Sequence, residues 1–192
     1  MSLSGNKLAG GNPAAQRVEN DFYATNPNAV NMILNKYNFY AQNILEPCVG
    51  QGHIAYAIDE FYNHSKNITA IDIVDRGYPN TIVTDFLNYQ TEKRYDGIIT
   101  NPPYSLAKEF VEHSMDLLDN DEFCIMLLKI QFLEGKARKE LFKKYPPKFV
   151  WVFSERQKCL KNDKDTGGSS AVCYCWFIWQ KGFNGKPLID WL

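Results

Sequence analysis

The sequence lacks several features that mark membrane, secreted and metal-binding proteins. Its uninterrupted apolar runs are only a few residues long, so no transmembrane helix is expected. Residues 1–16 contain no apolar segment of the kind found in a secretory signal, and we therefore expect a cytoplasmic protein. The five cysteines are an odd number at irregular spacing and are expected to be reduced thiols. The three histidines show no ligand spacing with them, so no metal site is predicted.

A strong excess of charge of either sign is also missing. The 192 residues carry a net charge of −1, which excludes a uniformly basic, histone-like protein. Apolar residues make up 45% of the chain, enough to build a buried core, so wholesale disorder is excluded. The charge is nevertheless uneven, because residues 136–164 hold ten Lys and Arg against three acids, a local charge of +7. This stretch is either a solvated surface or a surface that faces phosphates.

Strand-like and helix-like segments alternate along the chain. Apolar strand candidates lie at 43–46, 68–72, 81–84, 97–100, 122–129, 149–153 and 172–179, and helical spacing lies at 29–37, 53–61, 105–118 and 135–144. We expect Asn28 and Ser105 to cap two of these helices. The connections from the second to the third strand and from the third to the fourth are too short for a full crossover helix. Seven strands with interspersed helices predict a doubly wound α/β sheet in a single domain, preceded by a flexible tail at residues 1–20.

A glycine turn follows the first predicted strand. Gly50, Gly52 and Ala55 form a Gly-x-Gly-x-x-Ala pattern, in which the glycines allow a tight bend and let a ligand approach the backbone. Asp72 ends the second strand, where a carboxylate can accept the hydroxyl hydrogens of a ribose. Glu46 precedes the glycines and disfavours a pyrophosphate at this turn. The pattern therefore favours S-adenosylmethionine, whose sulfonium-bearing amino acid suits a carboxylate, over a dinucleotide.

The tetrad Asn101-Pro102-Pro103-Tyr104 directly follows the fourth strand. Its two prolines end the strand and fix a rigid, extended turn. The tetrad is then expected at the carboxyl edge of the sheet, where open α/β sheets bind ligands. Asn101 offers a carbonyl acceptor and Pro102 a backbone carbonyl, which together can hold the two hydrogens of a planar amino group, while Tyr104 offers a stacking face. The plain alternative is a strand-terminating turn with a packed tyrosine.

In these residues the sequence resembles the S-adenosylmethionine-dependent adenine-N6 methyltransferases, and it is most similar to the small enzymes of bacteriophages and prophages. The resemblance implies a Rossmann-like methyltransferase fold, with a mostly parallel seven-stranded sheet and an antiparallel last strand. It also implies one catalytic domain over residues 21–192, without a separate target-recognition domain. The implied cofactor is S-adenosylmethionine and the implied substrate is DNA, with RNA or a protein as alternatives. No membrane partner is expected.

The resemblance also gives roles to individual residues. The implied catalytic residues are Asn101, Pro102, Pro103 and Tyr104. The implied cofactor-binding residues are Tyr23, Thr25, Glu46, Pro47, Gly50, Gly52, Asp72, Asp85, Phe86 and Asn101, of which Asp85 and Phe86 hold the adenine of the cofactor. From the basic stretch we expect nucleic-acid contacts by Lys136, Arg138, Lys139, Lys143, Lys144, Arg156 and Lys158.

Three other functions fit parts of this pattern. The tetrad can also hold the carboxamide of a glutamine, which would make the protein a glutamine-N5 methyltransferase. The glycine turn alone fits an NAD(P)-dependent oxidoreductase, and the basic stretch fits a nucleic-acid-binding module without activity. Methyl transfer to a planar amino nitrogen, most simply N6 of adenine in DNA, accounts for all the motifs together. Positioning and electrostatics would supply the catalysis, with the target base flipped out and stacked on Tyr104.

Overall fold

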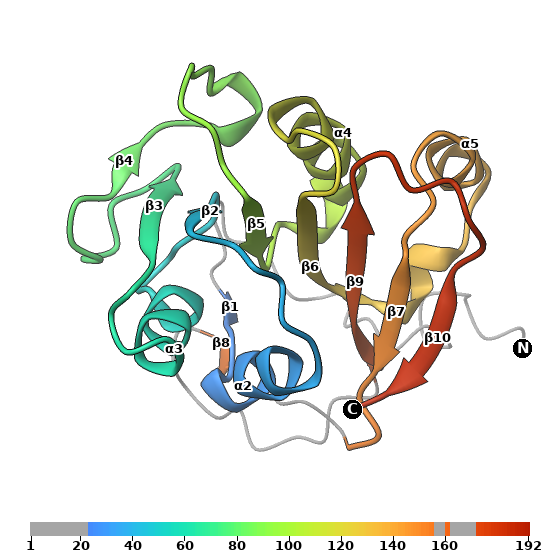
Figure 1. Ribbon diagram of the computed structural model, residues 1–192, viewed down its shortest axis with the longest axis horizontal. Coiled ribbons are helices and arrows are strands. Elements are labelled where there is room, and N and C mark those ends of the chain that lie inside the picture. The colour runs from blue at the N-terminus through green and yellow to red at the C-terminus, as the bar shows by residue number, and fades with distance from the viewer. Residues whose placement is uncertain (1–22, 156–159, 162–171) are drawn as a thin grey trace, which may run out of the picture.

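Eight described strands form one twisted sheet in the order β10-β7-β9-β6-β5-β2-β3-β4 (Figure 1). The computed structural model describes residues 23–155, 160–161 and 172–192. The strands of this sheet are β2 (Asn43–Glu46), β3 (Asn67–Asp72), β4 (Ile82–Val83), β5 (Gly97–Thr100), β6 (Phe123–Lys129), β7 (Phe149–Val152), β9 (Tyr174–Gln180) and β10 (Leu188–Trp191). Neighbouring strands are parallel except where β9 pairs with β6 and with β7. The short strands β1 (Tyr23–Ala24) and β8 (Leu160–Lys161) form a separate antiparallel pair.

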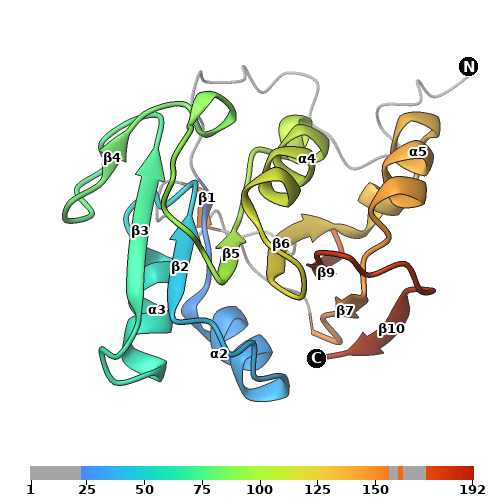
Figure 2. The same ribbon diagram turned by 45° about the horizontal axis from the view of Figure 1, so that its top comes forward.

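Helices cover both faces of the sheet (Figures 1 and 2). The helices α2 (Pro27–Lys36) and α3 (His53–Phe61) lie on one face, and α4 (Ala107–Leu117) and α5 (Lys136–Lys144) lie on the other. Three 3-10 turns, η1 (Phe86–Asn88), η2 (Tyr104–Leu106) and η3 (Ile130–Leu133), follow strands β4, β5 and β6. Within the described part of the chain, no helix has both the length and the apolar character needed to cross a membrane.

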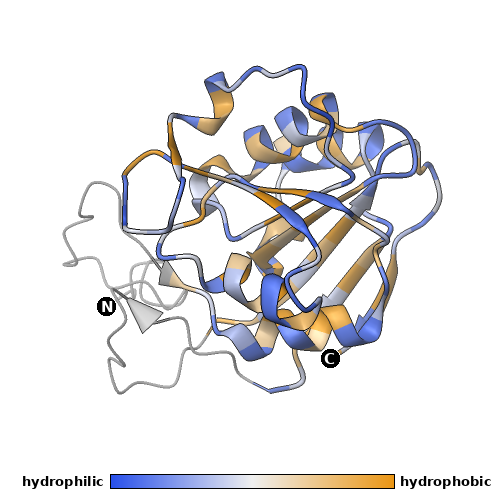
Figure 3. Ribbon diagram, turned by 60° about the vertical axis from the view of Figure 1, so that its left-hand side comes forward, coloured by the Kyte–Doolittle hydropathy of each residue, from blue (hydrophilic) through white to orange (hydrophobic). Residues whose placement is uncertain are grey.

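Two apolar cores follow from the alternation of side chains along each strand. On β6, Ile125 and Leu127 join the core under α2 and α3, whereas Cys124, Met126 and Leu128 join the core under α4 and α5. Figure 3 shows the central strands mainly in orange and much of the outer helices and loops in blue. Because both faces are covered, a central strand reads as an uninterrupted apolar run, which is why β6 could be recognised in the sequence.

The predicted elements are present, with differences at their ends. The bounds of α3 are as predicted, and no α-helix connects β3 to β4 or β4 to β5. The predicted caps are wrong at two helices. Asn26, rather than Asn28, caps α2, since its side chain accepts the Asn28 N–H at 3.0 Å and Pro27 occupies the first turn. Ser105 lies inside η2, and α4 begins after Leu106 without a side-chain cap.

The strand β10 is the main element that the sequence analysis missed. It pairs in parallel with β7 at the edge of the sheet, so the sheet has eight strands in the described residues rather than seven. The predicted antiparallel strand is β9, and it is followed in the chain by this additional strand. All four residues of β10 are exposed, so neither alternation nor a buried apolar run marked it. The predicted tail at residues 1–20 lies outside the described residues.

Candidate functional site

The carboxyl ends of β3, β2, β5 and β6 lie side by side at one edge of the sheet. The strand β3 ends at Asp72, β2 ends at Glu46, and the tetrad begins directly after β5 at Asn101. The strand β6 ends at Lys129. Parallel strands bring the residues that follow them to the same edge, so the glycine turn, the acid and the tetrad come together as the sequence predicts.

The glycine turn is fixed by the carboxylate of Asp72. The backbone N–H of Gly50 donates to Asp72 Oδ2 at 2.8 Å, and the N–H of Val74 donates to Asp72 Oδ1 at 3.0 Å. Asp72 is 8% exposed, and the guanidinium of Arg76 lies 3.9 Å from its Oδ1. Gly50 and Gly52 have φ values of +55° and +89°, a region that favours glycine. The two glycines are therefore required by the backbone, and Asp72 connects the end of β3 to the turn after β2.

An aromatic side chain lies against the second glycine of the turn. A Cβ atom built on Gly52 would be 2.1 Å from Cδ2 of Tyr78 and 2.9 Å from Cε2 of Tyr56. These two rings make an edge-to-face contact, with 5.0 Å between their centroids. In this structure the Tyr78 ring thus occupies the space that a side chain at position 52 would need. Burial, with a contribution from Glu46, raises the pKa of Tyr78 to about 12. Tyr78 could not be identified from the sequence, because no motif marks the loop between β3 and β4.

Three carboxylates surround the beginning of the glycine turn. Glu46 is 1% exposed, and its Oε2 has no hydrogen-bond partner among the described residues. Burial raises the pKa of the Glu46 carboxyl group well above its usual range, and the nearby charge of Asp72 raises it further. The pKa of the Cys48 thiol is also raised, first by burial and then by the charges of Asp72, Glu46 and Asp85. The thiol is therefore protonated at neutral pH. The three acids lie close enough to this turn for each of them to raise the pKa of the thiol.

The tetrad is connected by a hydrogen bond to Thr25, one of the implied cofactor-binding residues. The Asn101 Nδ2 donates to Oγ1 of the buried Thr25 at 3.2 Å. This bond brings together two residues that are separated by 76 positions in the chain. Pro102 is buried and Pro103 is exposed. Pro47, after Glu46, is buried.

Tyr104 is in contact with two residues that the sequence analysis did not identify. Its ring is partly buried, with the Lys129 Nζ 4.7 Å from the ring centroid. The ring of Tyr174, at the beginning of β9, also lies near it, with 6.1 Å between the two ring centroids. Lys129 is the last residue of β6 and pairs with Tyr174, the first residue of β9. Because β9 is antiparallel, it contributes its beginning rather than its end to the edge where the tetrad lies.

Two predicted cofactor contacts have structural roles here. The Asp85 carboxylate caps η1, accepting from the Leu87 N–H at 3.0 Å and from the Asn88 Nδ2 at 2.9 Å. Phe86 is 2% exposed and packs on Phe110, with 4.9 Å between the ring centroids. The contact of Asp85 and Phe86 with a cofactor adenine stays a prediction. For Tyr23, the structure describes the backbone pairing in β1, and its side chain lies outside the described part.

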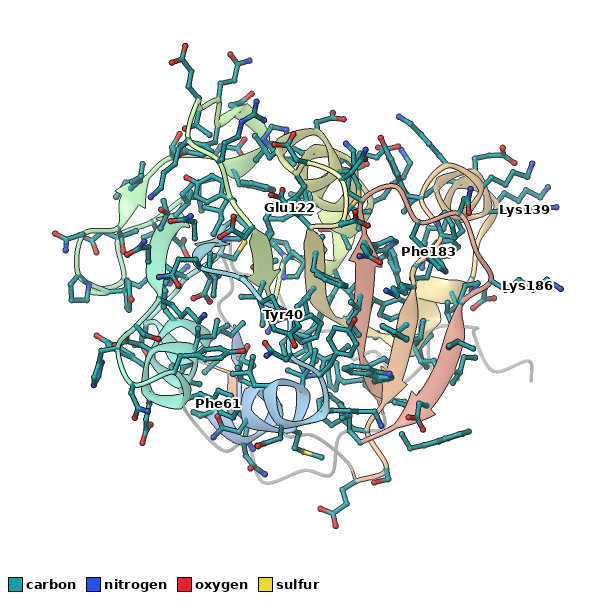
Figure 4. All side chains as sticks on the ribbon, in the orientation of Figure 1. Tyr40, Phe61, Glu122, Lys139, Phe183 and Lys186 are labelled. Carbon is teal, nitrogen blue, oxygen red and sulfur yellow. The ribbon has the colours of Figure 1, made fainter. Side chains whose placement is uncertain are left out.

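The basic residues of α5 lie along the whole length of the helix. Lys136 and Lys139 are exposed at its first two turns, and Figure 4 shows the Lys139 side chain extending away from the helix. The Arg138 Nη1 donates to the Gln131 carbonyl at 2.7 Å, and the Lys143 Nζ forms an ion pair with Glu140 at 2.8 Å. Arg156 and Lys158 lie outside the described residues.

The far end of α5 lies near the amino ends of the parallel strands. The Trp179 Nε1 donates to the Tyr145 carbonyl at 3.1 Å, and Trp179 pairs with Cys124 at the beginning of β6. Lys143 and Lys144 precede Tyr145 directly, so they lie away from the edge that carries the tetrad. In the sequence the basic residues form one stretch, but α5 places Lys136 and Lys139 at one end of the helix and Lys143 and Lys144 at the other. Among the residues described, no three His, Cys, Asp or Glu side chains gather as a metal cluster.

Comparison with known proteins identifies the fold but no close relative. No protein-family model and no curated protein matches the sequence. The methyltransferase subunit of the type I restriction-modification system from Streptococcus thermophilus superposes with a TM-score of 0.67 at 14% identity, covering 90% of this chain and 48% of that one. A Listeria monocytogenes protein assigned to the class I S-adenosylmethionine-dependent methyltransferases gives a TM-score of 0.60 at 14% identity, covering 86% of this chain and 64% of that one.

A third solved structure has the same fold. The 1,6-didemethyltoxoflavin-N1-methyltransferase from Burkholderia thailandensis, solved with S-adenosylhomocysteine, gives a TM-score of 0.54 at 13% identity, covering 81% of this chain and 77% of that one. The chain spans about half the length of the Streptococcus subunit and less than two thirds of the Listeria protein. At these identities the likeness concerns the fold alone, and this chain has the mixed α/β fold of the class I S-adenosylmethionine-dependent methyltransferases.

Proposed function

We propose that this protein is an S-adenosylmethionine-dependent methyltransferase that acts on a planar amino nitrogen, namely N6 of adenine in DNA. The observation that carries the proposal is the position of Asn101. It follows β5 at the carboxyl edge, donates to Thr25, and lies one strand away from the turn that Asp72 fixes. The motif for an amino group and the motif for a nucleoside cofactor are thereby neighbours on the same edge of one sheet.

The donors and acceptors of this edge fit S-adenosylmethionine. Each oxygen of Asp72 accepts one backbone N–H, and a carboxylate has about four acceptor positions, so acceptor capacity remains for ribose hydroxyl groups. Asp72 and Asp85 add negative potential around the glycine turn, which suits a ligand with a sulfonium and an ammonium group. When bound, the cofactor supplies an electrophilic methyl group on the sulfonium.

The chain itself would activate the amino group by accepting its hydrogens. The nitrogen of an adenine amino group is a poor nucleophile because its lone pair is delocalised into the ring. Asn101 Oδ1 and the Pro102 carbonyl oxygen would hold the two hydrogens and stabilise the positive charge that develops on the nitrogen. The bond from Asn101 Nδ2 to Thr25 sets which end of the amide is the acceptor. Tyr104 would stack on the base, which must leave the duplex to reach this edge.

The first test compares methylation by the wild-type chain and by an Asn101→Ala variant. Both are incubated with DNA and isotopically labelled S-adenosylmethionine, and N6-methyladenine is measured by mass spectrometry. We expect product from the wild type and a loss on the order of 100-fold or more in the variant. The matched control is Asn35→Ala, because Asn35 is exposed on α2 and its Nδ2 donates to the Asn31 carbonyl of its own helix. Its activity should equal that of the wild type.

Other products would identify the alternatives. Methylation of a glutamine in a release-factor-like peptide, without methylation of DNA, would replace the proposal with a protein methyltransferase. Binding of NAD(H) without binding of S-adenosylhomocysteine would replace it with an oxidoreductase. DNA binding without methylation of DNA or peptide, when S-adenosylmethionine is present, would leave a nucleic-acid-binding module.

A further inference from the structure

Lys129 is a cation in an unusual position at the carboxyl edge. It is partly buried at the end of β6, and its Nζ lies 4.7 Å from the centroid of the Tyr104 ring. Among the described residues it has no carboxylate at ion-pair distance, and this cation–π contact is the interaction that the structure gives its ammonium group. A lysine side chain loses conformational entropy when it is held, so an ammonium group held without a carboxylate is available to a negative ligand.

The register of β5 and β6 sets where Lys129 lies relative to the tetrad. Thr100 pairs with Met126, so Asn101 is level with Leu127 and β6 continues for two more residues. At about 3.3 Å per residue, the backbone of Lys129 lies roughly 7 Å beyond the level of Asn101, on the adjacent strand. A substrate whose amino group reaches Asn101 therefore has its remaining atoms on the side where Lys129 stands.

Charge is also arranged in order across this edge. The Asp72 carboxylate ends β3, the tetrad follows β5 on the far side of β2, and Lys129 ends β6. A negative group thus lies on one side of Asn101 and a positive group lies on the other. This order fits a cationic cofactor on the β2 and β3 side and an anionic substrate on the β6 side.

We propose that Lys129 binds a phosphate group of the nucleotide whose base enters the tetrad. This inference rests on the proposed function and adds that the substrate is anionic close to its reacting base, as a nucleotide is and a glutamine side chain is not. In the free protein Lys129 covers the face of Tyr104, and on binding it moves from the ring to the phosphate. Lys129 is thus a substrate-binding residue that also keeps Tyr104 in place before the base arrives.

The test is the salt dependence of DNA methylation. Initial rates of N6-methyladenine formation are measured against DNA concentration at several salt concentrations, and log kcat/KM is plotted against log salt. We expect Lys129→Gln to lower kcat/KM by roughly 10- to 100-fold, as for loss of a charge-assisted hydrogen bond. The slope should become less negative by about 0.9, the contribution of one phosphate on B-DNA. Lys129→Arg should restore the slope.

A matched control comes from another lysine over a tyrosine ring. Lys66 is also partly buried, and its Nζ lies 4.5 Å from the Tyr62 ring centroid, in the segment before β3 and away from the tetrad. Lys66→Gln should leave kcat/KM and the slope unchanged. Unchanged affinity for S-adenosylhomocysteine shows that a variant keeps its cofactor site, and Lys129→Met serves as the second test if Lys129→Gln does not fold.

The outcomes separate this inference from the function on which it rests. If the wild type methylates DNA but Lys129→Gln and Lys129→Met keep its slope and its kcat/KM, Lys129 binds no phosphate and only the inference is wrong. If both variants lose activity but keep the wild-type slope, Lys129 acts on Tyr104 alone and the phosphate contact is again wrong. If the wild type methylates a glutamine peptide and no DNA, the proposed function fails first, and the inference fails with it.

Discussion

Replacing Glu46 by glutamine is expected to change how the stability of the protein depends on pH. The carboxyl group is 1% exposed, and its Oε2 finds no partner in the described residues. Burial raises its pKa well above the usual range, with a further rise from Asp72. The folded chain therefore holds a proton that the unfolded chain releases at lower pH. Such a proton stabilises the folded state at low pH, and this stabilisation is lost as the pH rises through the folded pKa.

The magnitude follows from linkage. Between the unfolded pKa of a glutamate, near 4.3, and the raised folded pKa of Glu46, the folded state binds one more proton than the unfolded state. In this window the free energy of unfolding of the wild type falls by about 1.4 kcal/mol per pH unit relative to Glu46→Gln. Above the folded pKa the difference levels off. The glutamine keeps the size of the side chain and does not ionise, so the comparison isolates the proton.

The measurement is urea unfolding of both chains over a pH series, with the difference in unfolding free energy plotted against pH. Glu122→Gln is the control for the cofactor site. Burial raises the pKa of Glu122 as it raises that of Glu46, but Glu122 lies before β6 at the amino edge and away from the glycine turn (Figure 4). The Glu46 variant should also bind S-adenosylmethionine more weakly, whereas the Glu122 variant should bind it normally. A difference that stays flat with pH would mean that Glu46 ionises as it does in water, and the acidic environment of the glycine turn would be refuted.

Two further expectations concern the glycine turn and the basic helix. Gly52→Ala should destabilise the chain more than Gly77→Ala in urea unfolding: both glycines have φ near +90°, but an added Cβ meets a tyrosine ring at 2.1 Å at Gly52 and nothing within 4 Å at Gly77. Equal losses of stability in the two variants would mean that the Tyr78 ring moves aside at no cost. On α5, replacing Lys136 and Lys139 by alanine should flatten the salt dependence of DNA binding, measured by fluorescence polarisation, more than replacing Lys143 and Lys144. The opposite order would assign the nucleic-acid surface to the amino edge.

The fold could be predicted to the extent that its strands are buried on both faces. Residues 123–129 and 174–180 are long apolar runs because helices cover both sides of the sheet, and such runs are visible in a sequence. The strand at 188–191 carries no such signal. It is held at the edge by its pairing with β7 and by an ion pair of 2.7 Å between Lys36 and Asp190, which are far apart in the chain. Contacts of this kind depend on tertiary structure and have no local signature.

The same distinction applies to the candidate site. The hydrogen bonds of Gly50 with Asp72 and of Asn101 with Thr25 join residues that were already marked. Gly50, Asp72 and Asn101 lie at or just after the ends of predicted strands, and Thr25 was implied by the resemblance to known methyltransferases. Tyr78 was not marked, since its ring reaches Gly52 through a loop whose course no short pattern defines. The sequence also could not divide the basic residues of α5, because their distance from the tetrad depends on the direction in which the helix runs over the sheet.

The direction of β9 explains why half of the Tyr104 environment escaped detection. A search for functional residues in an open α/β sheet inspects the residues that follow each strand, because parallel strands deliver their ends to the ligand-binding edge. The antiparallel β9 delivers its first residue instead, and Tyr174 therefore lies opposite Lys129 and beside Tyr104. The first residue of this antiparallel run is as close to this edge as the last residue of the parallel strand β6. In a sheet with one reversed strand, both ends of the apolar runs must be inspected for substrate-binding residues.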